Sequence, residues 1–309
     1  MKLEFDYVIA GGGSAGCALA SRLCEDKSIT VCIVEAGGNG NNLFIKMPAG
    51  NGFVFGNPKL DWGYKSIPQK NLNNRTIYFP RGKSLGGSSI VNGMIYMRGI
   101  PSDYDSWRQL GLNGWGYSDI LPYFKKAEHN EVHKDEYHGQ NGPLNVCDIR
   151  HQPESCKSFV EAGSKLFNFN DDFNGAEQEG FGYYQTTQIN GKRCSAAKAY
   201  LVPVLDRDNL TVMTNTQVNK ILIDGSHAKG VECIDSDNHS FTLNASKEVI
   251  LSSGAFGSPQ ILLRSGVGPA NEITKHGIDH LVDLPGVGKN LQDHIDSVSY
   301  THLTLPTKA

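Results

Sequence analysis

The sequence lacks the features that mark nucleic-acid-binding and membrane-spanning proteins. Its 29 basic and 32 acidic residues give a net charge of −3, which leaves no basic surface for nucleic acid. Its longest weakly charged stretch, residues 249–263, is too short to cross a membrane and contains Pro259. Lys2, Glu4 and Asp6 precede the first apolar run, so the N-terminus has no signal-peptide layout. We therefore expect a cytoplasmic protein without a transmembrane segment or a nucleic-acid partner.

Paired cysteines and metal-ligand spacings are also missing. The seven cysteines are odd in number and include no C-x-x-C pair, so we expect reduced thiols, with Cys17 and Cys32 packed among apolar neighbours. His129, His133 and His138 cluster in the polar stretch EHNEVHKDEYH, but no cysteine or paired carboxylate completes a known metal-ligand spacing. We expect these histidines to lie on a solvated surface and to bind no metal.

What the chain does contain is a glycine motif close to its N-terminus. Gly11, Gly13 and Gly16 keep the spacing G-x-G-x-x-G directly after the apolar run YVIA. Small residues in 14–26 predict a helix that lies close to a sheet, and the β-branched stretch 29–37 predicts a second strand. Strand, glycine turn, helix and strand in this order are the context that dinucleotide binding requires.

Each glycine of this motif has a physical reason. Gly11 permits the tight turn, Gly13 lets a pyrophosphate approach the backbone, and Gly16 lets helix and strand pack closely. The helix N-terminus offers N–H groups and its positive dipole end to phosphates. Glu35, at the end of the second strand, is placed to accept hydrogen bonds from ribose hydroxyls and to repel a 2′-phosphate. A glycine turn that binds nothing is the alternative, but the full unit predicts an ADP-binding site.

A second glycine-rich loop, residues 80–99, bears on whether the ligand is NAD or FAD. Gly86 and Gly87 allow close backbone approach to a flat ring, while Ser89 adds a hydroxyl and Asn92 an amide. The first motif alone is compatible with either dinucleotide. Two glycine-rich segments far apart in the sequence indicate a long, extended ligand, which favours FAD.

Two other stretches predict local structure. Residues 102–128 place Trp107, Leu110 and Leu121 at helical spacing, which predicts packing against the core. The segments LTVMTNTQVNKILID, KGVECID and SFTLNASKEVILSSG predict a small β-meander that leads into a core strand.

Three stretches then carry a family resemblance. Residues 82–105 and 254–268 resemble the two signatures of the glucose–methanol–choline (GMC) oxidoreductases, and residues 284–294 resemble the turn that follows them. They occur in family order behind the nucleotide motif, and the likeness is strongest to bacterial choline dehydrogenases and aliphatic alcohol dehydrogenases. The resemblance implies an α/β fold: a Rossmann-like FAD-binding domain, whose parallel sheet has an added β-meander, plus part of a substrate-binding domain.

The same resemblance implies the domain organisation. Residues 1–150 would be the first part of the FAD-binding domain, residues 151–189 an excursion into the substrate domain, and residues 190–309 the second part of the FAD-binding domain. The family's C-terminal portion, which completes the substrate domain, has no counterpart here, so we expect a C-terminally truncated chain.

The resemblance also names cofactor-binding residues. The ADP half of FAD would be held by Gly11, Gly13, Ser14, Ala15, Gly16, Glu35 and Ala36, with Val218 beside the adenine. The flavin side would be lined by Trp62, Gly86, Gly87, Ser89, Asn92, Gly93, Met94 and Ile95. Some family members attach FAD covalently through a histidine at the position of Val91, so we expect noncovalent FAD here.

The implied activity is oxidation of an alcohol, choline or a primary aliphatic alcohol, to the aldehyde. The hydride would pass to flavin N5 and the electrons to a quinone-like acceptor, with peripheral contact at the inner membrane. No residue can be assigned as the catalytic base, and His294 is expected to have a structural or flavin-adjacent role. The alternatives are a flavin-binding fragment without turnover, or an oxidase or lyase of the same fold.

Overall fold

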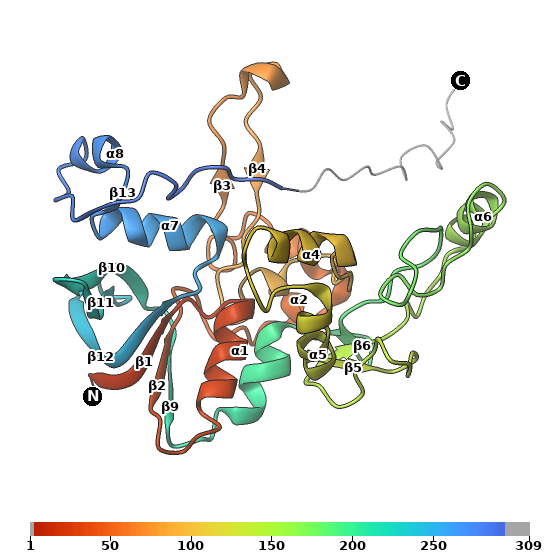
Figure 1. Cartoon of the computed structure of the whole chain (residues 1–309), viewed down its shortest axis with the longest axis horizontal. Helices are drawn as coiled ribbons and strands as arrows, with labels where there is room; N and C mark the ends of the chain where they lie inside the picture. Colours follow the sequence, from red (N-terminus) through yellow and green to blue (C-terminus); the bar gives the residue numbers. More distant parts are fainter. Residues whose placement is uncertain (1–2, 294–309) are drawn as a thin grey trace.

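The computed structural model describes residues 3–293 and centres on one six-stranded sheet, in the order β10-β11-β12-β1-β2-β9 (Figure 1). The strands are β1 (Glu4–Ala10), β2 (Val31–Val34), β9 (Leu210–Met213), β10 (Gln217–Asp224), β11 (His227–Ile234) and β12 (Ser240–Leu251). Strands β12, β1, β2 and β9 run parallel, while β10, β11 and β12 form an antiparallel meander. The predicted parallel sheet with an added meander is confirmed.

The parallel strands are buried on both faces, as their apolar sequences require. In β2, Val31 and Ile33 face one core, together with α1 (Ser14–Leu23) and the helical turn Ala197–Leu201. Cys32 and Val34 face the second core, with the meander and α7 (Gly254–Arg264). Cys17 and Cys32 are fully buried, so their predicted packing role is confirmed.

The register of the sheet decides where a ligand can bind. Ala10 at the end of β1 pairs with Val34 of β2 on one side and with Leu251 of β12 on the other. The carboxyl ends of three parallel strands therefore meet at one edge. In open α/β sheets this edge is where ligands bind.

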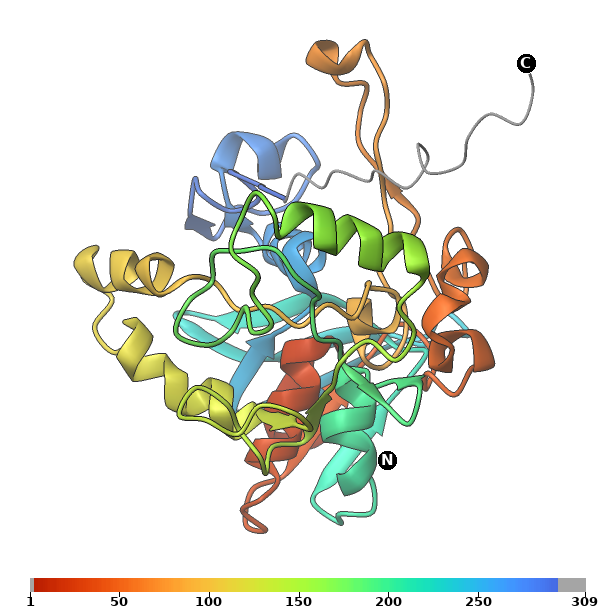
Figure 2. The ribbon, with the colours of Figure 1, turned by 90° about the vertical axis from the view of Figure 1, so that its right-hand side faces the viewer.

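Shorter elements surround the sheet, and Figure 2 shows the β3–β4 arm (orange) standing well clear of it. The remaining helices are α2 (Leu43–Lys46), α3 (Asn51–Val54), α4 (Pro101–Gln109), α5 (Tyr117–Ala127), α6 (Glu154–Gly163) and α8 (Ala270–Thr274). The short strands pair as β3 (Tyr64–Lys65) with β4 (Tyr78–Phe79), β5 (Glu128–Asn130) with β6 (Leu144–Val146), β7 (Gln188–Ile189) with β8 (Lys192–Arg193), and β13 (Val267–Gly268) with β14 (Val282–Asp283). Short helical turns are Pro48–Gly50, Lys70–Leu72, Gly87–Ile90 and Val202–Val204.

Two local predictions need correction. The stretch 102–128 is helical, but Trp107 is 42% exposed and Leu110 is 81% exposed, so these side chains do not pack into the core. The helix α4 begins at Pro101, whose ring suits the first helical position, and has no buried residue. In the predicted meander, the first segment contains two strands: β9 joins the parallel edge beside β2, while β10 begins the antiparallel meander as predicted.

Candidate functional site

A cavity of about 470 Å³ lies at the carboxyl ends of β1, β2 and β12. Its walls come from the first glycine turn, the end of β2, the second glycine loop, the start of β10 and the segment between β12 and α7. These segments are far apart in the sequence, and the parallel sheet brings them together. The position agrees with the binding edge that the fold predicts.

The first glycine turn has the backbone that its sequence predicts. Gly11 has φ +106°, and a Cβ there would lie 2.7 Å from the carbonyl oxygen of Ser252. A Cβ on Gly16 would lie 2.0 Å from the carbonyl oxygen of Gly11, which only glycine avoids. These two glycines therefore let β1 turn and let α1 pack against it.

Gly13 differs from its two neighbours in the motif, because the protein itself does not require a glycine there. Its φ of −76° suits any residue, and the nearest atom to an added Cβ would be 3.6 Å away. Gly13 lines the cavity at the N-terminus of α1, where no side chain caps the helix. The absence of a side chain leaves space for a ligand against the positive end of the helix.

Glu35 lies at the end of β2 and is 6% exposed. Its Oε2 accepts a hydrogen bond from the N–H of Gly12 (2.9 Å) and its Oε1 from the N–H of Gly37 (2.8 Å). Burial raises the pKa of the carboxyl, although these two N–H groups and Lys83 oppose the shift. The carboxylate thus joins the glycine turn to the end of β2 while still lining the cavity.

The second glycine loop packs directly against the first. The N–H of Gly86 donates to the carbonyl oxygen of Gly12 (2.7 Å). Gly87 has φ +53°, and a Cβ there would lie 2.7 Å from the Cα of Gly13. The two loops can approach this closely only because Gly87 has no side chain. The sequence alone indicated two glycine-rich segments for one ligand, and the structure shows them in contact.

The cavity brings together about half of the predicted cofactor-binding residues. Those that line it are Gly11, Gly13, Ser14, Ala15, Glu35, Ala36, Trp62, Gly87 and Val218. Those outside its lining are Gly16, Gly86, Ser89, Asn92, Gly93, Met94 and Ile95. The first two of these shape the glycine turns, and the others continue the second loop beyond Gly87.

Sequence reasoning did not assign the residues that follow β12, together with the start of α7, to the site. Ser252, Ser253, Gly254, Phe256 and Ser258 all line the cavity. A signal was present, because serine and glycine follow a core strand and precede a helix here, as in the first motif. A strand parallel to β1 ends at the same sheet edge, so the residues after it reach the same ligand space.

Arg81 and the rings of Trp62, Tyr64 and Phe256 line one wall of the cavity, and Lys83 lies beside that wall. The Lys83 Nζ lies 4.9 Å from the centre of the Trp62 ring, and the guanidinium of Arg81 lies 5.5 Å from that of Phe256. Tyr64 stacks on Trp62 with a distance of 5.8 Å between ring centres. This wall suits a flat ring, and its positive charges suit an anionic ligand.

The predicted exposure of the three histidines is wrong for His138, which is 3% exposed. Its Nδ1 lies 3.0 Å from Glu128 Oε1 and its Nε2 lies 2.9 Å from Asp172 Oδ2. Burial lowers the pKa of the ring, but the hydrogen bonds with Asp172 and Glu128 outweigh this and raise it to about 9. Arg98 pairs with the other oxygen of Glu128 at 2.7 Å. The sequence did not reveal this buried charge network, because two of its members, Arg98 and Asp172, lie outside the polar stretch.

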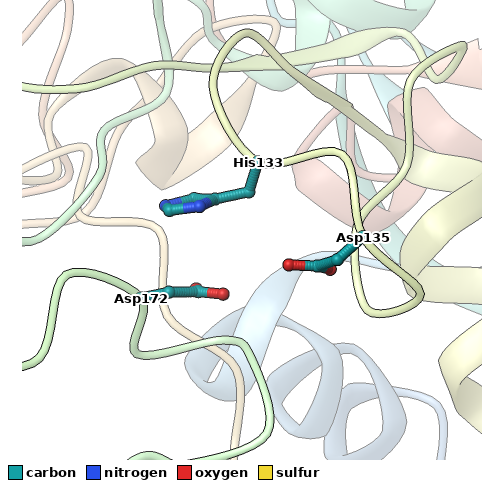
Figure 3. A group of neighbouring side chains, drawn as sticks. All are labelled: His133, Asp135 and Asp172. Atoms are coloured by element: carbon teal, nitrogen blue, oxygen red, sulfur yellow. The ribbon is translucent and has the colours of Figure 1, made fainter.

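His133, Asp135 and Asp172 point toward one another beside this network (Figure 3). One ligand atom from each lies within 4.8 Å of the others, close enough for a metal ion. However, Asp172 already bonds the protonated His138, and the Asp135 side chain is 47% exposed. The charge of Asp172 is therefore balanced without a metal, and the expectation that no metal binds here stays a prediction.

Two further predictions concern histidine and cysteine. His294, considered for a flavin-adjacent role, lies outside the described residues. The seven cysteines are all free thiols in the described structure, and Cys156 alone among them is exposed.

Between residues 3 and 293, no helix combines the length and apolar character needed to cross a membrane.

Comparison with known proteins adds relatives of named activity. The chain is 48% identical over 295 residues to an alcohol dehydrogenase (acceptor) of Pseudomonas putida, covering 94% of this chain and 53% of that one. It is 46% identical over 295 residues to an oxygen-dependent choline dehydrogenase of Sinorhizobium fredii, and this match covers 95% of this chain and 53% of that one. The chain thus spans about half the length of these curated relatives.

Solved structures show the same fold. The pyridoxine 4-oxidase from Mesorbium loti matches with a TM-score of 0.87 and 34% identity, over 91% of this chain and 55% of that one. A formate oxidase variant from Aspergillus oryzae matches with a TM-score of 0.83 and 28% identity, over 91% of this chain and 51% of that one. Residues 5–296 match the family described as GMC oxidoreductase. On this match and these relatives, the chain belongs to the GMC oxidoreductase family.

Proposed function

We propose that this chain is the FAD-binding part of an enzyme that oxidises an alcohol, choline or a primary aliphatic alcohol, to its aldehyde. The observation that carries the proposal is the contact between two glycine loops around one cavity at the carboxyl edge of the sheet. GMC oxidoreductases are FAD-dependent, and the two curated relatives are an alcohol dehydrogenase and a choline dehydrogenase.

The residues present fit an ADP moiety at one end of the cavity. Gly13 leaves space beside an uncapped helix N-terminus, where Ser14 and Ala15 would hold the pyrophosphate. Glu35 and Ala36 would contact the ribose, since each carboxylate oxygen of Glu35 keeps lone pairs beyond its bond to a backbone N–H. Val218, at the start of β10, would lie beside the adenine.

The flavin would lie toward the second glycine loop. Its neighbours would be Trp62, Gly86, Gly87, Ser89, Asn92, Gly93, Met94 and Ile95. Bound FAD would accept the hydride from the carbon that carries the alcohol oxygen. Val91 has no nucleophilic atom and is 5% exposed within an apolar cluster with Ile45 and Val54, which supports noncovalent binding.

The domain organisation belongs to the same proposal. Residues 1–150 supply β1 and β2, and residues 190–309 supply β9 to β12, so both segments build the one FAD-binding sheet. Residues 151–189 would belong to the substrate domain. The rest of that domain and the catalytic base would lie in the half of the relatives that this chain does not span. In the same proposal, the reduced flavin passes its electrons to a quinone-like acceptor. The enzyme lies in the cytoplasm, with peripheral contact at the inner membrane.

The test compares two proteins that differ in length. We expect the 309 residues alone to bind FAD but not to reduce it with choline or primary alcohols, because no residue among them is assigned as the base. We expect a protein extended with its native downstream sequence to bleach the flavin absorbance under anaerobic alcohol. An extended protein that binds FAD and is not reduced by any alcohol would contradict the proposed reaction. Bleaching by the 309 residues alone would place the base among them.

A further inference from the structure

Arg193, at the end of β8, is a buried cation without an acidic partner. It is 4% exposed, and burial lowers the pKa of its guanidinium to about 10. Across the described residues 3–293, no carboxylate forms an ion pair with it. The guanidinium is therefore fully charged at neutral pH in the protein interior, which is costly unless other groups compensate the charge.

The hydrogen bonds of this guanidinium go to neutral oxygens. Nε donates to the carbonyl of Ile45 (3.2 Å), and Nη2 donates to Oδ1 of Asn51 (2.8 Å). Nη1 donates to the carbonyl of Ser89 (3.3 Å) and to both the carbonyl (2.7 Å) and Oδ1 (2.8 Å) of Asn92. The planar fork thus fastens the second glycine loop to α2 and to the start of α3, and leaves a net positive charge behind the loop.

The loop that Arg193 holds has an unusual backbone. Gly86, Gly87 and Met94 have φ of +98°, +53° and +62°. Among the described residues, Met94 is the one with positive φ that is neither glycine nor asparagine. Such a conformation costs about 1–3 kcal/mol and persists where the surroundings hold it. Arg193 bonds the loop between these positions, and the loop itself closes the cavity at Gly87.

A buried cation whose hydrogen bonds all go to neutral oxygens suits a site that gains negative charge during the reaction. Resting on the proposed function, we propose that Arg193 is a positioning residue that holds a fixed positive charge behind the flavin end of the cavity and thereby favours the reduced form of bound FAD. A hydride taken from the alcohol, which carries two electrons and one proton, would leave a negative charge on the bound ring. A fixed cation nearby stabilises that form more than it stabilises the neutral oxidised ring.

Asn51→Asp tests the charge without disturbing the loop. It places a carboxylate against Nη2, on the side of the fork away from Ser89 and Asn92, and Asn51 is outside the cavity lining. All three bonds from Nη1 to the loop remain. We expect the affinity of this variant for FAD to lie within about threefold of that of the wild type, because the residues that line the cavity are unchanged. We expect its flavin reduction potential, measured by equilibration with a redox dye, to become more negative.

Two further variants keep the inference falsifiable. Asn57→Asp makes the same chemical change nearby without touching Arg193, and we expect no shift in potential. Arg193→Lys keeps the charge but not the fork, so we expect weaker FAD binding with a potential close to that of the wild type. An unchanged potential in Asn51→Asp, with FAD bound, would overturn this inference and leave the proposed function intact. A wild-type protein that binds no FAD would overturn both.

Discussion

At the scale of single residues, Glu35 connects folding to binding. Its two oxygens accept hydrogen bonds from the N–H groups of Gly12 and Gly37, so the carboxylate fixes the glycine turn against the end of β2. The family pattern explains its place at the strand end, but the two backbone bonds depend on the close approach of the turn and were not predictable from the sequence. A carboxylate that lines a cavity and is held in this way is preorganised for a ribose.

We expect Glu35→Ala to weaken FAD binding about tenfold or more, because charge-assisted hydrogen bonds to a ligand contribute roughly 1.5–3 kcal/mol. Glu25→Ala is the control, since Glu25 is exposed, pairs with Arg22 and lies outside the cavity lining. The measurement is a titration of each apoprotein with FAD, with the melting temperature recorded to separate binding from folding. Equal FAD affinity in the two variants would show that Glu35 does not contact the cofactor.

His138 leads to a prediction about pH. Its pKa is raised from 6.5 to about 9, so the protonated ring stabilises the folded state fully below pH 6.5, and this contribution is lost as the pH rises through about 9. The difference corresponds to about 3 kcal/mol. The pKa values of Glu128 and Asp172 are lowered, so their contribution is lost on acidification below their ordinary values of 4.5 and 3.8.

We therefore expect the free energy of unfolding to be greatest near pH 5 to 6.5 and to decline toward pH 9. Denaturant unfolding at several pH values measures it. His138→Gln should be less stable at pH 6 and should show a flatter decline between pH 6.5 and 9. A decline of equal slope in the wild type and this variant would assign the pH dependence to other groups.

At the scale of elements, α1 and its glycine turn show what a sequence pattern can and cannot predict. The β1–α1–β2 unit follows from apolar runs and glycine spacing, which are local properties. The contact between Gly13 and Gly87 depends on the sheet bringing distant loops together, so spacing alone does not predict it. The buried position of His138 was not predictable for the same reason, because its partner Asp172 lies 34 residues away in the sequence.

The motif glycines give a matched pair of variants at this scale. We expect Gly16→Ala to destabilise the fold, because its Cβ would lie 2.0 Å from the carbonyl oxygen of Gly11. We expect Gly13→Ala to fold with a melting temperature close to the wild type, because its Cβ would meet nothing nearer than 3.6 Å. The same methyl group would occupy ligand space, so FAD affinity should fall at least tenfold. Normal FAD binding by Gly13→Ala would show that the pyrophosphate does not bind at this position.

At the scale of the whole molecule, apolar side chains are exposed in and around α6. Phe159, Leu166, Phe167 and Phe169 are 57%, 81%, 61% and 58% exposed. They fall within residues 151–189, which we propose belong to a substrate domain. An exposed apolar patch of this kind is typical of a surface that packs against another part of a protein. We propose that the half of the relatives beyond this chain covers it.

The central claim is that the cavity between the two glycine loops binds FAD without a covalent bond. The most direct measurement is a titration of the purified apoprotein with FAD, followed by acid precipitation of the loaded protein. We predict saturable binding of one FAD per chain, and a colourless precipitate with all of the flavin in the supernatant, because Val91 offers no nucleophile. No binding of FAD, or yellow colour retained in the washed precipitate, would contradict the account.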